Sequence, residues 1–175
     1  MIEIWKDIIG YEGVYQISNL GSIKSLIRTV RNNKSGSVRY IKEQVLSRVN
    51  TNSSGYLNIC LYKGNKSKHF YIHRLVAEYF VEKIEGKNFV NHKNGIKTDN
   101  VFTNLEWCTK QENVIHAIET GLNPNDYSCK RVVDKSTGEE FKSIKIAAIH
   151  FKIPPTTLSH RLIGRLKNNT NLEFA

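Results

Sequence analysis

The sequence lacks the features that define several large protein classes. Its three cysteines, Cys60, Cys108 and Cys129, form no Cys-x-x-Cys pair, so we expect neither a disulfide framework nor a structural zinc site. No apolar run approaches the about 18 residues that span a bilayer, and the N-terminal segment has no secretory-signal pattern. Three prolines and 39% hydrophobic residues argue against a collagen-like or disordered chain. We therefore expect a cytoplasmic protein with a packed core and no membrane contact.

Charge is distributed unevenly along the 175 residues. Lys and Arg number 26 against 16 Asp and Glu, which gives a net charge of +10. Residues 1–70 carry +7, residues 71–127 carry −2 and residues 128–175 carry +5. Basic segments attract polyanions, because each Lys or Arg beside a phosphate releases condensed counterions. A nucleic acid partner is one interpretation and a merely solubilising surface is the other. Charge alone favours neither.

The N-terminal region predicts antiparallel β-structure. Residues 14–18 and 22–26 are short segments on either side of an Asn-Leu-Gly turn, which indicates a hairpin. Residues 56–62 and 69–72 predict a second hairpin, joined by residues 63–67. The polar, glycine-containing residues 31–37 predict a loop.

The central region predicts a helix, two strands and a second helix. Apolar residues recur at helical spacing over residues 73–80. Residues 89–92 and 104–108 predict strands, and the Asn-Gly turn at positions 94 and 95 follows the first of them. A helix is then predicted from Thr109 to Thr120, ending at a glycine.

The C-terminal region predicts a small hairpin followed by two short helices. Residues 131–134 and 140–141 are the predicted strands, Ser143 is placed to cap a helix over residues 144–151, and residues 155–163 predict a second helix. Two short helices joined by a tight turn indicate a helix-turn-helix, although a purely structural helical hairpin has the same pattern.

These elements define the expected fold class, an α+β protein with three modules. A β-rich DNA-binding module over residues 1–70 would precede a strand–strand–helix core over residues 71–127. A hairpin with a helix-turn-helix would occupy residues 128–175.

Six segments together resemble the HNH nuclease family, in its branch of bacteriophage and intron-encoded homing endonucleases. The central match is carried by residues 91–100 (NHKNGIKTDN), 104–107 (NLEW) and 112–117 (ENVIHA). Residues 73–76 (HRLV) and 5–21 match modules usual in that branch, and the C-terminal segment looks like its DNA-binding repeat module. The resemblance implies a ββα-metal nuclease core and a site-specific endonuclease that acts on double-stranded DNA. One active site per chain makes nicking the expected outcome for a monomer.

The resemblance also implies a role for each motif residue. His92 would be the general base, since imidazole titrates near neutral pH. Asn91 and Asn113 would hold one divalent metal ion through their amide oxygens, which suit Mg²⁺ or Mn²⁺ better than zinc. Asn104 would brace the loop that carries the histidine.

Two positions depart from the family pattern. Many relatives carry an aspartate where this chain has Asn91, and a neutral amide binds a divalent cation more weakly. Others place a second histidine at the position of Ala117, and His116 beside it is a substitute ligand, a DNA contact or a surface residue. Near the motif, we expect His73 to be a half-buried histidine with its hydrogen bonds satisfied, and Arg74 to be within reach of a phosphate.

The two basic regions are expected to bind DNA, the N-terminal one along the backbone or in a groove and the second C-terminal helix at base edges. The candidate contact residues are Arg28, Arg31, Lys34, Arg39, Lys42, Thr156, Thr157, Ser159, His160 and Arg161. No heptad pattern or long apolar surface argues for a dimer, so we expect a monomer on DNA. The alternative is a DNA-binding regulator of the same fold whose nuclease centre has decayed. Intact His92, Asn104 and Asn113 favour the enzyme, and Asn91 alone favours the alternative.

Overall fold

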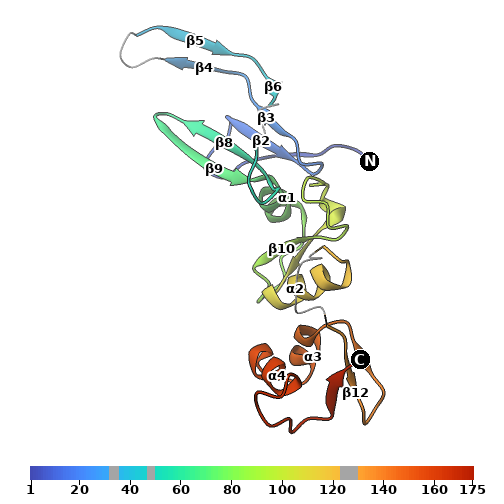
Figure 1. The fold of residues 1–175 in the computed structure, drawn as a ribbon. Coiled ribbons are helices and arrows are strands. Elements are labelled where there is room, and N and C mark those ends of the chain that lie inside the picture. Colours follow the sequence, from blue (N-terminus) through green and yellow to red (C-terminus); the bar gives the residue numbers. More distant parts are fainter. Residues whose placement is uncertain (32–35, 47–49, 123–129) are drawn as a thin grey trace. The chain divides into compact units, whose positions relative to one another are not determined.

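A computed structural model describes residues 1–31, 36–46, 50–122 and 130–175 (Figure 1). The chain divides into two compact units, Met1–Lys110 and Gln111–Ala175. The first unit has one hydrophobic core that includes Ile17 and Leu61 as well as Val76 and Leu105. Residue 70 therefore does not separate two cores, and the division into three functional modules stays a prediction. In the part of the chain that the structure describes, no helix is both long and apolar enough to cross a bilayer.

The N-terminal sheet has the strand order β1-β2-β3-β6 and is antiparallel throughout. Its strands are β1 (Trp5–Asp7), β2 (Tyr15–Ser18), β3 (Ile23–Ser25) and β6 (Gln44–Val45). The alternation in residues 14–18 places Tyr15 and Ile17 in the core, as a half-buried strand requires. The predicted β2–β3 hairpin is confirmed, with Ile17 opposite Ile23.

The sequence did not predict the hairpin that follows β3. β4 (Arg28–Arg31) and β5 (Val38–Ile41) form a separate two-stranded antiparallel pair (Figure 1). The expectation of a loop over residues 31–37 is wrong at Arg31, which pairs with Val38; residues 32–35 lie outside the described part. Neither strand alternates apolar and polar residues cleanly, because both strands are largely exposed and bury no regular face.

The third sheet leads directly into the first helix. Its strand order is β7-β8-β9, with β7 (Asn50–Thr51), β8 (Leu57–Lys63) and β9 (Lys66–Tyr71). The predicted β8–β9 hairpin is confirmed, but its turn is shorter than expected, because Lys63 pairs with Lys66 and Gly64 provides the positive φ of 60°. The predicted helix is α1 (Ile72–Phe80), which buries Leu75 and Val76.

Two short strands carry the HNH motif. β10 (Phe89–His92) pairs antiparallel with β11 (Leu105–Cys108), so that His92 lies opposite Leu105. Residue 104 was expected in the second strand but ends the 3-10 turn η1 (Phe102–Asn104) just before it. α2 (Lys110–Glu119) follows, as predicted, and Gly121 comes after it with a φ of 68°.

The second unit contains a three-stranded sheet with the order β13-β12-β14 and two helices. These elements are β12 (Val132–Asp134), β13 (Glu140–Phe141), α3 (Ile144–His150), α4 (Pro155–Leu162) and β14 (Leu172–Phe174). The predicted hairpin and both helices are confirmed, and the Ser143 hydroxyl accepts the Ile146 N–H at 3.2 Å as the cap of α3. Strand β14 was missed; its Leu172 joins Val132 and Leu158 in the core of this unit.

Candidate functional site

His92 is held at the end of β10 with one ring nitrogen already engaged. Its side chain is 4% exposed, and its Nε2 lies 3.0 Å from Asn100 Oδ1. The Asn100 Nδ2 donates to the Thr98 carbonyl at 3.4 Å, which turns Oδ1 toward the imidazole. An amide oxygen can only accept, so Nε2 carries the proton and Nδ1 is the basic nitrogen. Burial is the main cause that lowers the pKa of His92, while the hydrogen bond to Asn100 and the charge of Asp99 oppose it.

Asn104 ties together the two ends of the loop that follows His92. Its Oδ1 accepts the Asn94 backbone N–H at 3.0 Å, and its Nδ2 donates to Asn94 Oδ1 at 3.0 Å and to the Asp99 carbonyl at 2.8 Å. The Asn104 carbonyl also accepts the Lys93 N–H at 2.8 Å. These three side-chain hydrogen bonds fix the geometry of the loop, and none of them goes to the imidazole. Asn104 therefore influences His92 through the loop.

Asn91 and Glu106 form a polar pair across the two strands. They are opposite one another in the β10–β11 register, and Asn91 Nδ2 donates to Glu106 Oε1 at 2.8 Å. Asn91 is buried and Glu106 is half-buried. This bond engages the amide nitrogen with the carboxylate, so Oδ1 is the atom of Asn91 that a metal ion would bind. Sequence reasoning did not select Glu106; the signal was its place in the second strand, opposite a motif residue.

His73 corrects one expectation from the sequence. It is buried, with 7% of its side chain exposed, and its Nδ1 has no hydrogen-bond partner among the described residues, so it is neither half-buried nor satisfied. Its ring lies 5.2 Å from that of His92 and 4.8 Å from that of Tyr56, between centroids. Burial lowers the pKa of His73 to about 3, with smaller contributions from the charges of His92 and Arg74. His73 is therefore a neutral neighbour of His92.

The remaining motif residues lie on helices. Asn113 is in the first half of α2 and His116 in its last turn, and both are half-buried. They belong to the second unit, so a shared metal site with Asn91 stays a prediction. Arg74 is exposed on α1.

The N-terminal arginines differ in what they contact. Arg28 donates from one guanidinium nitrogen to the Val14 and Leu26 carbonyls and to the Ser25 hydroxyl, and it packs 5.1 Å from the Tyr15 ring centroid, so it has a structural role whatever else it binds. Arg31 is exposed on β4 and Lys42 is exposed just after β5. Lys34 lies outside the described residues.

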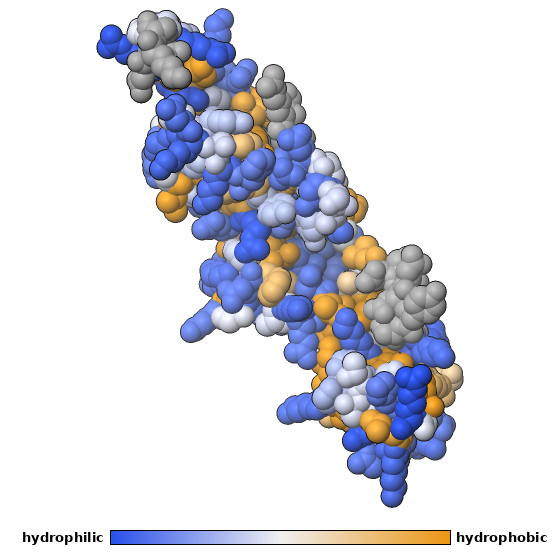
Figure 2. All heavy atoms as spheres, turned by 60° about the vertical axis from the view of Figure 1, so that its left-hand side comes forward, coloured by the Kyte–Doolittle hydropathy of each residue, from blue (hydrophilic) through white to orange (hydrophobic). Residues whose placement is uncertain are grey.

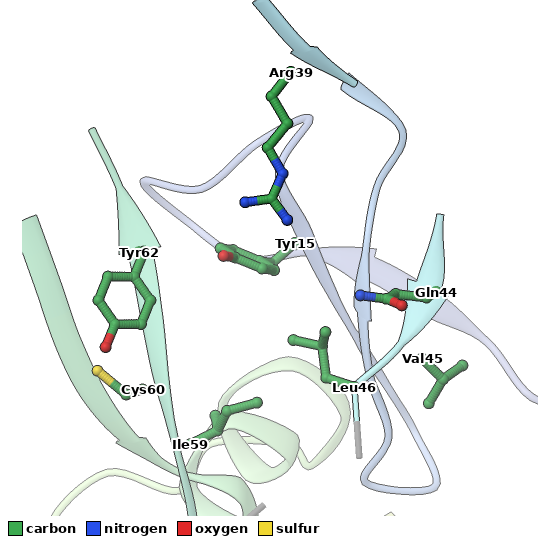
Figure 3. A pocket seen from close by; sticks show the side chains of 8 residues that line it. All are labelled: Tyr15, Arg39, Gln44, Val45, Leu46, Ile59, Cys60 and Tyr62. Carbon is green, nitrogen blue, oxygen red and sulfur yellow. The ribbon is translucent and has the colours of Figure 1, made fainter. Parts of the chain in front are cut away.

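Arg39 lines a cavity of about 460 Å³. Figure 3 shows its guanidinium pointing toward the Tyr15 ring, with Gln44 and Tyr62 also facing the cavity. The walls mix apolar and polar groups, and the full lining is Tyr15, Arg39, Gln44, Val45, Leu46, Ile59, Cys60 and Tyr62. Arg39 is exposed, so its side chain is accessible to a ligand outside the cavity as well.

The predicted recognition residues share α4 with one core residue. Leu158 is buried and anchors the helix, Thr156 and His160 are exposed, and Thr157, Ser159 and Arg161 are half-buried. Hydrophilic side chains dominate most of the face that Figure 2 displays. The polar surface of α4 suits a polar partner, but contact with DNA stays a prediction.

Comparisons with known proteins identify both the N-terminal region and the central motif. Residues 3–62 match the NUMOD4 motif and residues 70–115 match the HNH endonuclease model. A solved structure titled "DNA binding and cleavage by the HNH homing endonuclease I-HmuI" is similar over 98% of this chain and 98% of that chain, with 31% identity and a TM-score of 0.51. The chain belongs to the HNH homing endonuclease family.

Two curated proteins are similar to this chain over part of their length. DNA endonuclease I-HmuI of Bacillus phage SP01 is 43% identical over 117 residues, which are 67% of this chain and 59% of that protein. HNH endonuclease L245 of Acanthamoeba polyphaga mimivirus is 33% identical over 171 residues, 95% of this chain and 46% of that protein. The matched parts of this chain thus span about half to three fifths of these relatives.

Proposed function

We propose that this chain is a homing-type DNA endonuclease that hydrolyses phosphodiester bonds with His92 as general base. The observation that carries the proposal is the buried imidazole whose Nε2 is bound by Asn100, because that bond leaves Nδ1 as a base in a fixed orientation. A relative whose printed title names DNA binding and cleavage, with a fold match over 98% of this chain, supports the same reading.

The chemistry assigned to the chain's own residues is a proton transfer. His92 Nδ1 takes a proton from a water whose oxygen forms a bond to the phosphorus atom, and the bond from phosphorus to the 3′-oxygen breaks. The 3′-oxygen takes a proton from solvent and becomes the 3′-hydroxyl, and the 5′-phosphate stays on the other fragment. The lowered pKa of His92 keeps the imidazole neutral near pH 7, which a base requires. Asn104 acts through the loop it braces, and His73 fills the space beside the base with an uncharged ring.

One divalent metal ion fits the donors beside His92. Among the described residues no three His, Cys, Asp or Glu side chains gather as a metal site, but the Asn91–Glu106 pair offers an amide oxygen and a carboxylate, and both are oxygen donors of the kind that Mg²⁺ and Mn²⁺ prefer. We propose Asn91 and Glu106 as its ligands in the first unit; Asn113 as a further ligand stays a prediction from the motif. When bound, such an ion supplies positive charge that stabilises the phosphoryl oxygens and the leaving oxygen. Glu106 would restore the negative charge that an amide at position 91 lacks.

The proposed partner is double-stranded DNA. The exposed hairpin β4–β5 presents Arg31 and Arg39, and α4 presents Thr156 and His160 on its surface. A two-stranded ribbon and a short helix both fit the major groove. We assign the ribbon mainly to backbone contacts and α4, with Thr157, Ser159 and Arg161 at its flanks, to base contacts.

The function is tested by cleavage of DNA that the protein itself selects. Duplexes bound from a random-sequence library are cloned into a plasmid, and the supercoiled plasmid is incubated with the full chain and Mg²⁺ or Mn²⁺. We expect relaxed circles with 3′-hydroxyl and 5′-phosphate ends that appear only with metal. Tight binding of the selected site without any cut would instead identify a DNA-binding regulator, the function that the neutral Asn91 favours.

A further inference from the structure

A tight turn of the N-terminal region lies against the loop that carries Asn100. The turn spans residues 18–22, between β2 and β3, and the Ser18 hydroxyl accepts the N–H groups of Leu20 and Ser22 at 3.3 and 3.0 Å. Gly21 adopts a φ of +88°, and a Cβ built on it would lie 2.9 Å from Asn100 Cβ and 3.3 Å from the Asn100 carbonyl oxygen. The two backbones are therefore too close for any side chain at position 21.

Asn19 in the same turn holds the chain just after Asn100. Its carbonyl accepts the Phe102 N–H at 2.9 Å. Asn19 is itself fixed, because its Oδ1 accepts the Ile4 N–H at 2.8 Å and its Nδ2 donates to the Ile2 carbonyl at 3.1 Å. Asn19 and Asn100 are both buried, at 2% and 4% exposure. Residues 100–102 thus rest on a rigid support that comes from the opposite end of the unit's sequence.

We propose that Asn100 is a positioning residue that fixes the tautomer of His92, and that the Gly21 turn is the part of the N-terminal region that holds Asn100 in register. The chain of contacts runs from Asn19 and Gly21 to Asn100 and from Asn100 Oδ1 to His92 Nε2. The orientation of the Asn100 side-chain amide decides which tautomer of His92 is favoured. If it were reversed, Asn100 Oδ1 would face the Thr98 carbonyl oxygen and two acceptors would meet.

The consequence for cleavage rests on the proposed function, but the tautomer does not. A His92 without Asn100 is free to carry its proton on Nδ1, and an imidazole in that form cannot take a proton from water at Nδ1. The inference therefore predicts that a change in the N-terminal turn alters the chemistry of a base 71 residues further along the chain, with no change in DNA contacts.

Two glycine-to-alanine substitutions with similar backbone strain separate the effect of the contact with Asn100 from the effect of the strain alone. Gly21→Ala places a methyl group against Asn100 and strains a φ of +88°. Gly10→Ala strains a φ of +80° in the same region, and a Cβ there meets nothing within 4 Å, so it controls for strain alone. Asn100→Leu removes the acceptor at similar volume, whereas Asn100→Asp keeps an acceptor oxygen. Asn100→Ser is the reserve if leucine prevents folding, as judged by thermal melting.

The primary readout needs neither DNA nor metal. The full chain is labelled with ¹⁵N in its six histidine rings, and long-range ¹H–¹⁵N spectra are recorded at about pH 8, where histidine is neutral. His92 is assigned by the signal lost in His92→Gln. We expect the proton on Nε2 in the wild type, Gly10→Ala and Asn100→Asp. A mixture or the Nδ1–H form is expected in Asn100→Leu, and a partial shift toward it in Gly21→Ala.

The second readout is the single-turnover cleavage rate on a bound site. We expect the rate to fall by about 10- to 100-fold in Asn100→Leu and Gly21→Ala, with the DNA dissociation constant unchanged, which is the usual effect of removing a residue that orients a reacting group. Gly10→Ala should cut at the wild-type rate. A wild-type Nδ1–H tautomer, or an Nε2–H tautomer that persists in Asn100→Leu, overturns the inference. Equal tautomers and equal rates in Gly21→Ala and Gly10→Ala overturn the role of the turn.

The two readouts keep this inference distinct from the proposed function. If the tautomer responds to Asn100 and Gly21 as expected but the wild type never cuts DNA, the positioning contact stands and the endonuclease assignment fails. If the wild type cuts but the tautomer does not respond, the assignment stands and the positioning inference fails.

Discussion

Asn91 and Glu106 face each other across the β10–β11 pair, with Asn91 Nδ2 2.8 Å from Glu106 Oε1. The neutral amide and the carboxylate are thus coupled in orientation, one strand position away from His92. This relationship bears on the neutral residue at position 91, because under the proposed function Glu106 would supply from the opposite strand the negative charge that an amide lacks.

Glu106→Gln is expected to weaken metal binding by about 10- to 100-fold, as loss of a residue that ligates or orients a ligand usually does. The measurement is Mn²⁺ binding followed by electron paramagnetic resonance, with the Mn²⁺ concentration for half-maximal cleavage as a second value. Glu78→Gln, at an exposed glutamate on α1, is the matched control. Equal Mn²⁺ affinity in both variants would remove Glu106 from the metal site.

His73 makes the stability of the first unit depend on pH. Its pKa is lowered from 6.5 to about 3 in the folded chain, so the unfolded chain binds more protons between these values. The free energy of unfolding that depends on a neutral His73 is therefore fully present above pH 6.5 and is lost as the pH falls toward 3. Urea unfolding at pH 7 and pH 4 should show His73→Gln losing less stability than the wild type over this interval, by on the order of 2–3 kcal/mol. Parallel pH profiles in the two proteins would contradict the burial of a neutral imidazole.

Site choice and cleavage are expected to be separable through α4. Replacing Thr156, His160 and Arg161 together by alanine should broaden the set of DNA sites that are cut, while cleavage itself persists. The slope of log affinity against log salt should fall by about one unit if Arg161 contacts a phosphate. Lys135→Ala is the control, because this substitution also removes one positive charge, and Lys135, just after β12, pairs with Glu173 at 3.0 Å. An unchanged site preference in the triple variant would show that α4 does not read bases.

The chain is expected to act as a monomer that nicks. One His92 per chain cuts one strand at a time, so relaxed circles should appear before linear product. Analytical ultracentrifugation on a DNA duplex with one site should give one chain per duplex. Two chains per site, with linear DNA appearing without a nicked precursor, would contradict this expectation.

Local patterns predicted most of the elements around the site. The Asn-Gly turn and the short apolar segments around it were enough to place β10 and β11, and the helical spacing of residues 73–80 placed α1. The β4–β5 hairpin was missed because an exposed ribbon has no buried face to impose alternation. Strand β14 was missed because it pairs with β12 across about 40 residues of intervening chain.

Residues that act through non-local contacts could not be found from the sequence. Asn100 is one of several asparagines in a polar loop, and only the folded loop brings its Oδ1 to His92. The sequence around Gly21 predicts only an ordinary turn, whereas the lack of room for a side chain at this position comes from Asn100, 79 positions away. The orphan Nδ1 of His73 likewise depends on which side chains surround it, and the sequence favoured a satisfied histidine.

The proposed role of His92 as general base is tested by the cleavage rate of His92→Ala on the selected DNA site under single-turnover conditions with Mg²⁺. The rate should fall by about 10² to 10⁴, the contribution of a positioned general base, while the DNA dissociation constant stays within about twofold because the buried imidazole neutralises no phosphate. His116→Ala, at the other histidine of the motif region, should retain most of the activity. If His92→Ala cuts at nearly the wild-type rate, His92 is not the general base, and loss of activity in His116→Ala instead would assign the base to α2.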